Sequence, residues 1–440
     1  MDGIQGNPIY SEMSNPEIID TLQRNPDEPS EHEHMEPSEA PAQEEDEERK
    51  WLWAFPQIEG VPPCSRGGHS ATLTGASLVI FGGHYYSGKE IGFVYLNDTH
   101  VLDVNASKWI KPKILGTPPP PRYGHSAALA GSRIIIFGGK GPKGTAYRDL
   151  HALDPVTMTW FQGPEGGGAP NARFDHTANL IGGTKLFIFG GWNGQEFFND
   201  VYILDLEIMA WSQPSTSGPA PCPRKGHCSI LIGTNLVIHG GFQFKADKIK
   251  KAKNKIGTTL QQCYLNDIRV LDTETFVWSR LRVSGTPPEH RFDHTMDISG
   301  PDIIMFGGWT KTSGNKEKHE PKEGSSDYFM IWSTNDMSWK KGKYIGVPPT
   351  TRFGHTSTAI GPHLLIFGGW EYSKAQNEII VLRECTSRMG SQKDHSEPGD
   401  GGIISEGEYG NYEAEGDREG SGLGDVDEEG QDQYSDNQAV

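Results

Sequence analysis

The sequence lacks the features of disulfide-rich or metal-binding proteins, of secreted proteins and of membrane-spanning proteins. It has five cysteines in 440 residues, and they are odd in number, widely spread and without CxxC spacing: Cys64, Cys222, Cys228, Cys263 and Cys385. This pattern argues against a disulfide framework and a zinc or redox motif, and favours reduced thiols in the cytoplasm. The first residues lack a basic segment followed by an apolar one, so no secretory signal is predicted. No apolar run approaches the ~20 residues that span a bilayer, so no membrane association is expected.

Basic residues are almost missing from both ends of the chain. Residues 1–48 contain 15 acidic residues and one base, Arg24, and residues 396–440 contain 14 acidic residues and one base, Arg418. The total charge of −18 therefore hides a core, residues 49–395, with a net charge of +9. Both ends are poor in large apolar side chains. We predict disordered acidic tails at 1–48 and 391–440 around one domain at 49–390.

What the sequence does contain is a sixfold internal repeat. Each copy begins with Arg-x-x-His and, about sixteen residues after the Arg, has a short aliphatic run that a glycine pair ends, as in LVIFGG or IIIFGG. The run is too short for a helix and predicts a buried strand with a sharp exit. The segment after each His is made of small residues, which suits the innermost strand of a radial assembly. The arginines and histidines are Arg66, His69, Arg122, His125, Arg173, His176, Arg224, His227, Arg291, His294, Arg352 and His355.

A tryptophan marks the outer strand of each copy and shows how the ring closes. A third strand ends in Leu-Asp, whose Asp predicts a hairpin turn, and the tryptophan follows six residues later in four copies. The sixth copy has no tryptophan of its own, whereas Trp53 stands thirteen residues before Arg66, the spacing found in the other copies. We therefore predict that the strand around Trp53 completes the sixth blade and removes an open edge. The tryptophans are Trp53, Trp109, Trp160, Trp211, Trp278 and Trp339.

Copy five departs from this pattern. Trp332 stands near the usual Leu-Asp position, and the distance from Asp327 to Trp339 is one residue longer than the corresponding distance in other copies. We expect a bulge or an altered hairpin there, without loss of the blade.

The glycine pair, the strand-three Asp and the strand-four Trp together resemble a kelch repeat, over roughly residues 51–384. The resemblance implies an all-β, six-bladed kelch β-propeller closed by the N-terminal strand. Enzymes occur on this fold, but the Cys–Tyr pair of the copper oxidases it resembles and the spaced Glu, Asp and His of the glucosinolate-diverting kelch proteins have no counterpart here. We therefore expect no enzyme activity, no catalytic residues, no metal and no cofactor, and we interpret the repeated Arg and His as structural.

The connections from strand two to three and from strand four to one should share one face, and this face carries the candidate binding residues. Four large aromatic residues follow the glycine pairs, and aromatic anchors are typical of interfaces: Trp192, Phe242, Trp309 and Trp370. These rings could equally cap the gap between blades. The long connection of copy four adds a lysine cluster: Lys245, Lys248, Lys250 and Lys251. It suits an acidic protein, a phosphorylated surface or nucleic acid, or is a solvated loop without a ligand.

The function that this pattern favours is a non-enzymatic, cytoplasmic scaffold that binds another protein through the strand 2–3 and 4–1 loop face. A protein partner is expected, and a nucleic-acid or membrane partner is not. Two alternatives stay open. One is a substrate receptor of a ubiquitin ligase, although residues before the repeats leave no room for a BTB-sized assembly domain. The other is a cytoskeletal or ciliary component.

Overall fold

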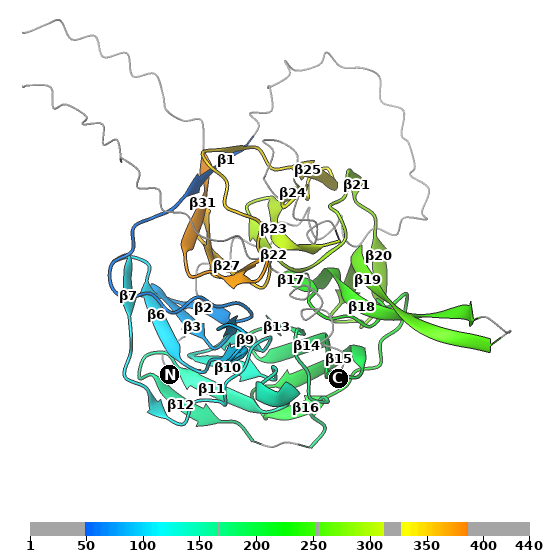
Figure 1. Ribbon diagram of the computed structural model, residues 1–440, viewed down its shortest axis with the longest axis horizontal. Helices are drawn as coiled ribbons and strands as arrows, with labels where there is room; N and C mark the ends of the chain where they lie inside the picture. The colour runs from blue at the N-terminus through cyan, green and yellow to red at the C-terminus, as the bar shows by residue number, and fades with distance from the viewer. Residues whose placement is uncertain (1–48, 165–166, 252–254, 312–326, 386–440) are drawn as a thin grey trace, which may run out of the picture. The chain divides into compact units, whose positions relative to one another are not determined.

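A computed structural model describes residues 49–164, 167–251, 255–311 and 327–385 of the chain. Six antiparallel sheets follow one another around a common axis, and Figure 1 looks along this axis. The predicted all-β, six-bladed propeller is therefore confirmed. The tails predicted at 1–48 and 391–440 lie outside the described residues. The described part of the chain contains no helical segment able to span a membrane.

The first strand of each blade lies nearest the axis and contacts the first strands of its two neighbours. The innermost strands are β2 (Ser70–Thr74), β9 (Ser126–Ala130), β13 (Thr177–Ile181), β17 (Cys228–Ile232), β22 (Arg291–Ser299) and β27 (Thr356–Ile360). The aliphatic runs form the buried second strands. These are β3 (Ser77–Phe81), β10 (Arg133–Phe137), β14 (Lys185–Trp192), β18 (Asn235–Lys251), β23 (Asp302–Thr310) and β28 (His363–Phe367).

The third strand of each blade ends in a tight turn that leads to the tryptophan strand. In four blades the Asp at this turn accepts two backbone N–H hydrogen bonds, as Asp103 does from Asn105 and Ala106. The third strands are β6 (Thr99–Asp103), β11 (Leu150–Asp154), β15 (Phe197–Asp205), β19 (Lys255–Asp272), β24 (Phe329–Ser333) and β31 (Ile379–Cys385). The outer strands are β7 (Lys108–Ile110), β12 (Thr159–Gln162), β16 (Ala210–Ser212), β20 (Trp278–Leu281), β25 (Ser338–Lys341) and β1 (Lys50–Ala54).

Strand β1 closes the ring by joining the sixth blade. It pairs antiparallel with β31, with Trp53 opposite Leu382, and Figure 1 shows the first strand of the chain beside the last. Trp51 and Trp53 are buried, and the guanidinium of Arg49 forms ion pairs with Glu384 and Asp302. The closure predicted from the position of Trp53 is confirmed.

Three blades carry a fifth strand that the sequence did not reveal. After its outer strand the chain pairs in parallel with the outer strand of the next blade, through β8 (Leu115–Gly116), β21 (Ser284–Gly285) and β26 (Tyr344–Ile345). These short strands cover backbone groups at the edge of the neighbouring sheet, so less of that edge is open to pairing with another chain.

Blade five corrects one expectation. Trp332 pairs with Trp339 as Leu102 pairs with Trp109, so the hairpin has the same register as in blade one and no bulge. The extra residue lies before β24, where the carbonyl of Tyr328 instead of Asp327 accepts the hydrogen bond from the first glycine of the pair.

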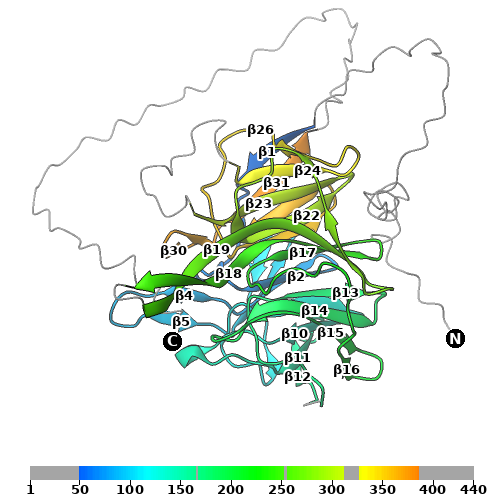
Figure 2. The same cartoon turned by 90° about the vertical axis from the view of Figure 1, so that its right-hand side faces the viewer.

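The connections between second and third strands differ from blade to blade. Blade four extends β18 and β19 into a two-stranded ribbon that runs out beyond the ring (Figures 1 and 2) and stays in register as far as the Lys251–Lys255 pair. The other described connections are short. They contain the hairpins β4 (His84–Tyr86) with β5 (Phe93–Tyr95) and β29 (Trp370–Glu371) with β30 (Lys374–Ala375), and the 3₁₀ turn η2 (Pro142–Gly144).

The core is built between blades rather than inside one sheet. The tryptophan of each outer strand packs on the aromatic residue that precedes the glycine pair of the preceding blade. Trp160 lies 4.8 Å from Phe81 between ring centroids, and Trp53 lies 5.2 Å from Phe306. In blade four the partner of Trp339 is His239, at 5.6 Å. Each blade thus buries its apolar surface only when its neighbour is in place.

The buried position of β1 predicts where the chain can be shortened. Removal of residues 1–48 is expected to leave the melting temperature nearly unchanged, whereas removal of 1–56 deletes two buried tryptophans, exposes an edge and causes aggregation. As a point test, Trp53→Ala should destabilise the fold by about 3–5 kcal/mol. Phe55→Ala is the matched control, because Phe55 is 46% exposed. Equal melting temperatures for the two truncations in calorimetry would contradict the closure.

Candidate functional site

The six repeat arginines are buried and hold together the two connections of their own blade. Arg66 donates from Nη1 to the carbonyl of Gly82 at 2.9 Å and forms an ion pair with Asp98 at 2.7 Å. This guanidinium holds the pKa of the Asp98 carboxyl below its ordinary value against the opposing effect of burial. The same arrangement recurs in the other blades, where the acid partners are Asp149, Asp200, Asp267, Asp327 and Glu378. Removing one partner would leave a buried charge uncompensated.

The six repeat histidines join neighbouring blades. His125 Nε2 lies 3.0 Å from the Ser70 hydroxyl of the preceding blade, and its ring meets Phe81 of that blade edge-on at 5.3 Å. The phenylalanine before the glycine pair therefore has a tryptophan on one side and a histidine on the other. Burial lowers the pKa of His125 to about 3, so the ring is neutral. The five other junctions carry His69, His176, His227, His294 and His355.

The junction between blades four and five has different partners. The residue after His227 is Cys228, where the other copies have Ser or Thr. His294 is bonded instead to Nδ1 of His239, at 2.9 Å, and His239 stands where the other copies have phenylalanine. Burial raises the pKa of the Cys228 thiol to about 12, and a thiol is a poor hydrogen-bond partner. The histidine in strand two thus replaces the missing hydroxyl.

A closed circle of six backbone hydrogen bonds surrounds the axis. The third residue of each Arg-x-x-His motif donates its N–H to the carbonyl of the same residue in the preceding blade, at 2.7 to 2.9 Å. All six residues have a positive φ, between 52° and 64°. Glycine adopts this conformation readily, and four copies have it, but two have aspartate. The circle consists of Gly68, Gly124, Asp175, Gly226, Asp293 and Gly354.

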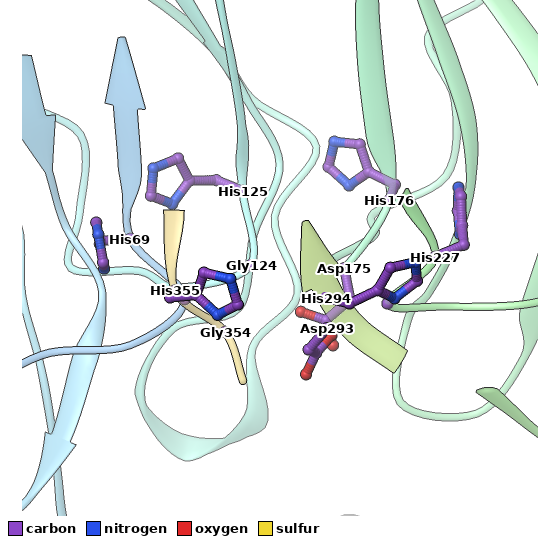
Figure 3. Close-up of a pocket in the computed structure, with 12 residues that line it drawn as sticks. His69, Gly124, His125, Asp175, His176, His227, Asp293, His294, Gly354 and His355 are labelled. Atoms are coloured by element: carbon purple, nitrogen blue, oxygen red, sulfur yellow. The ribbon is translucent and has the colours of Figure 1, made fainter. Parts of the chain in front are cut away.

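These residues and the six histidines line a cavity of about 190 Å³ on the axis, and Figure 3 shows the two carboxylates on the same side of it. Asp175 forms an ion pair with Lys225 at 3.2 Å. Burial, and secondarily the Asp175 charge, raise the pKa of Asp293 to about 8. Among the described residues no group of three or more His, Cys, Asp and Glu is arranged to hold a metal ion. Carboxyl groups at a cavity can accept hydrogen bonds from a ligand.

An aromatic collar surrounds the entrance to this cavity, on the side of the strand 2–3 connections. Its residues follow the glycine pairs or the repeat arginines, except Phe197, which begins β15, and the two sets meet through backbone bridges such as Phe174 with Trp192. Neighbouring rings lie 4.0 to 6.2 Å apart between centroids. The collar consists of His84, Tyr123, Phe174, Trp192, Phe197, Phe242, Phe292, Trp309, Phe353 and Trp370.

The structure brings the four predicted aromatic partner-binding residues to this collar, but it buries three of them. Trp192, Phe242 and Trp370 are 3%, 6% and 1% exposed. They therefore pack against their neighbours in the free protein, and their contact with a partner stays a prediction. Trp309 is half-buried.

The predicted lysine cluster lies on the ribbon of blade four, away from the cavity. Lys245 is exposed. Lys248, Lys250 and Lys251 lie in β18 by their backbone pairing, and their side chains are outside the described residues.

Sequence reasoning missed Asp175 and Asp293, although comparing the six copies of Arg-x-x-His would have found them. It also missed the acid partners of the arginines, whose signal is an Asp four residues before the Leu-Asp in four copies. The backbone circle leaves no such signal, because main-chain groups are the same in every residue.

Comparison with known proteins agrees with the geometry. Residues 92–308 match the model of the KLHDC2/KLHL20/DRC7 Kelch-repeats domain. Acyl-CoA-binding domain-containing protein 4 of Arabidopsis thaliana is 34% identical over 58% of this chain, and the match covers 35% of that protein. Human host cell factor 1 is 28% identical over 74% of this chain and 16% of its own length. Human Kelch domain-containing protein 3 is 29% identical over 71% of this chain and 79% of its own length. The chain thus corresponds to a part of the first two relatives.

The exceptional junction of blade four predicts a compensating pair. His239→Phe restores the residue of the other blades but leaves buried His294 without its partner, which should destabilise the fold by about 1–3 kcal/mol. Adding Cys228→Ser supplies the hydroxyl that the other blades use and should recover at least half of the loss. Cys228→Ser alone is the control and should have a small effect. Chemical unfolding of the four proteins measures the coupling, and additive effects of the two changes would contradict this interpretation.

The buried histidines also predict acid sensitivity. Burial lowers the pKa of His227, His239 and His355 from 6.5 to about 3, and that of the other repeat histidines in the same direction. The unfolded chain therefore binds more protons, so stability is complete above about pH 6.5 and is lost as the pH falls toward 3. Each histidine contributes up to about 1.4 kcal/mol per pH unit in this range.

Three carboxyl groups, Asp293, Asp297 and Asp302, have a raised pKa and act in the opposite direction, but the histidines outnumber them. The midpoint of urea unfolding should therefore fall clearly between about pH 7 and pH 5. An unchanged midpoint over this interval would show that the histidines are not held neutral.

Proposed function

Because this chain is a kelch-repeat β-propeller, we propose that it is a non-enzymatic scaffold that binds a protein partner through the face of the strand 2–3 and 4–1 connections. Kelch propellers are generally interaction domains, and both the matching Kelch-repeats model and the relative Kelch domain-containing protein 3 support this class. The aromatic collar around the axial cavity is the observation that favours this face as the binding surface.

The two ends of the strands differ in a way that supports this face. At one end, four strand 3–4 turns have the same Asp-capped geometry, with a positive φ four residues after the Asp, as at Ser107 and Met158. At the other end, the connections include short hairpins, a 3₁₀ turn and a long ribbon. A surface that differs from blade to blade can be specific for one partner, whereas a repeated one serves the fold.

The same face offers accessible aromatic rings. Tyr86 in the hairpin of blade one is 38% exposed, and Phe93, Tyr264 and Trp309 are half-buried. Partly exposed aromatic side chains above a packed base are suitable anchors for a partner. The buried rings Trp192, Phe242 and Trp370 would act by holding this base, and Lys245 and the ribbon would extend the contact to an acidic partner.

The two alternatives, a substrate receptor and a cytoskeletal or ciliary component, would use this face in the same way. They differ from a simple scaffold in requiring a second protein, a ligase or a polymer, at another surface. We also propose that the protein acts in the cytoplasm, where its five free cysteines would stay reduced.

Substitutions on the two faces test the proposal. After crosslinking and mass spectrometry identify a partner, Trp309→Ala should weaken its binding by about 2 kcal/mol or more, as removal of an interface anchor does. Ile208→Ala is the matched control, because Ile208 is an apolar residue, 73% exposed, in a strand 3–4 turn at the opposite end. Calorimetric titration gives the two affinities. If Ile208→Ala weakens binding and Trp309→Ala does not, the assigned face is wrong.

A further inference from the structure

Two aspartates stand at axial positions where the repeat has glycine. Asp175 and Asp293 have φ values of 52° and 54°, in the left-handed region that side chains with a Cβ rarely adopt. The four other copies meet the same backbone requirement with glycine, which shows that the circle of hydrogen bonds does not need a carboxylate. The circle of hydrogen bonds therefore does not explain these two side chains.

The two aspartates flank Gly226 in the circle, and each carboxylate lies against the preceding glycine, Gly124 for Asp175 and Gly226 for Asp293, but they do not have equivalent partners. A Cβ placed on Gly226 would stand 2.4 Å from Oδ1 of Asp293, and the neighbouring Lys225 donates to Asp175 at 3.2 Å. Within the described part of the chain, the carboxyl group of Asp293 has no hydrogen bond and no ion pair. One carboxyl group at the cavity is thus paired with a lysine, whereas the other has only the longer-range attraction of Lys225.

The rest of the cavity wall carries no positive charge. Each of the six histidines is 5–7% exposed, lines the cavity (Figure 3) and is kept neutral by burial. Nε2 is used for the neighbouring blade, and Nδ1 of all six has no hydrogen-bond partner among the described residues. When Nε2 carries the proton, Nδ1 is an acceptor. These Nδ1 atoms lie below the surface of the cavity, so the side-chain acceptors that its wall offers to a ligand are the two carboxyl groups.

We propose that the axial cavity receives a guanidinium group, the side chain of an arginine that a protein partner inserts between Asp293 and Asp175. This inference rests on the binding face proposed above. A guanidinium is a planar cation with five donors, and it pairs with carboxylates and stacks on aromatic faces. The cavity of about 190 Å³ has room for it, and the aromatic collar would contact its aliphatic stem. Lys225 and Lys140 already lie over the rings of Phe174 and Trp192, at 5.0 to 6.0 Å, so the collar accommodates cations.

The test uses the full-length protein and two small probes. Nα-acetyl-arginine amide carries the guanidinium, and the matching citrulline amide has the same shape without the charge. The arginine probe should raise the melting temperature in a saturable manner, since it binds only the folded protein. We expect the citrulline probe to bind at least about tenfold more weakly, because it forms no charge-assisted hydrogen bond.

Two variants locate the probe. Asp293→Gly and Asp175→Gly install the residue of the other blades, so both proteins should fold, and tryptophan fluorescence confirms this. Asp293→Gly should weaken binding of the arginine probe by about tenfold or more. Glu207→Gln, which removes an exposed carboxylate at a strand 3–4 turn, should not change it. Equal binding of the two probes, equal binding by Asp293→Gly and the unchanged protein, or no saturable response would overturn the proposal.

The outcome is separable from the test of the binding face. The probe experiment needs no partner, whereas Trp309→Ala is measured with one. If Trp309→Ala impairs partner binding while Asp293→Gly alters neither the probe nor the partner affinity, the face is correct and the arginine pocket is not. If the arginine probe binds through Asp293 and the partner is insensitive to both changes, the cavity assignment stands and the face assignment fails.

Discussion

The phenylalanine at the end of the second strand carries most of the contact between one blade and the next. Phe81 of blade one has Trp160 of blade two on its outer side and His125 on its inner side, at 4.8 and 5.3 Å. Aromatic contacts of this kind stabilise by about 0.5–1.5 kcal/mol each beyond the area they bury. Since the tryptophan and the histidine both belong to the following blade, their spacing in the sequence sets the position of one sheet on the other. The repeated residues therefore determine the contacts between neighbouring blades rather than the structure of a single blade.

The contacts between neighbouring blades must form a closed ring. Six sheets have six junctions only if the last blade meets the first, and Trp53 in β1 supplies the outer contact that blade six lacks. Once every junction is filled, the strands are held from both sides, and the connections at the ends are free to vary. This separation explains how one chain combines nearly identical strand 3–4 turns with strand 2–3 connections that range from a short hairpin to the ribbon of β18 and β19.

Much of the fold could be read from the sequence because the repeated residues are those that meet at the junctions. The six blades, the inner and outer strands and the closure all follow from the positions of the Arg-x-x-His motifs and of Trp53. The extra residue of blade five was placed in the wrong segment, because Trp332 stands where other copies have leucine and resembles a shifted register. The burial of Trp192 and Trp370 was not predictable either, since a single ring after a glycine pair has the same sequence context whether it faces a neighbour or solvent.

The candidate site depends on departures from the repeat, and these are of two kinds. At the junction of blades four and five, Cys228 removes a hydroxyl and His239 restores a hydrogen-bond partner. One departure from the repeat is thus compensated by another within the chain. At the axis, Asp175 is paired with Lys225, whereas the carboxyl group of Asp293 has no hydrogen bond and no ion pair among the described residues. A half-buried carboxyl group without a hydrogen-bond or ion-pair partner is unfavourable for the fold alone, and its partial burial beside Asp175 raises its pKa. A departure that the chain compensates is explained by folding. One that it leaves uncompensated, at an opening ringed by aromatic residues, is better explained by a partner that brings the missing cation.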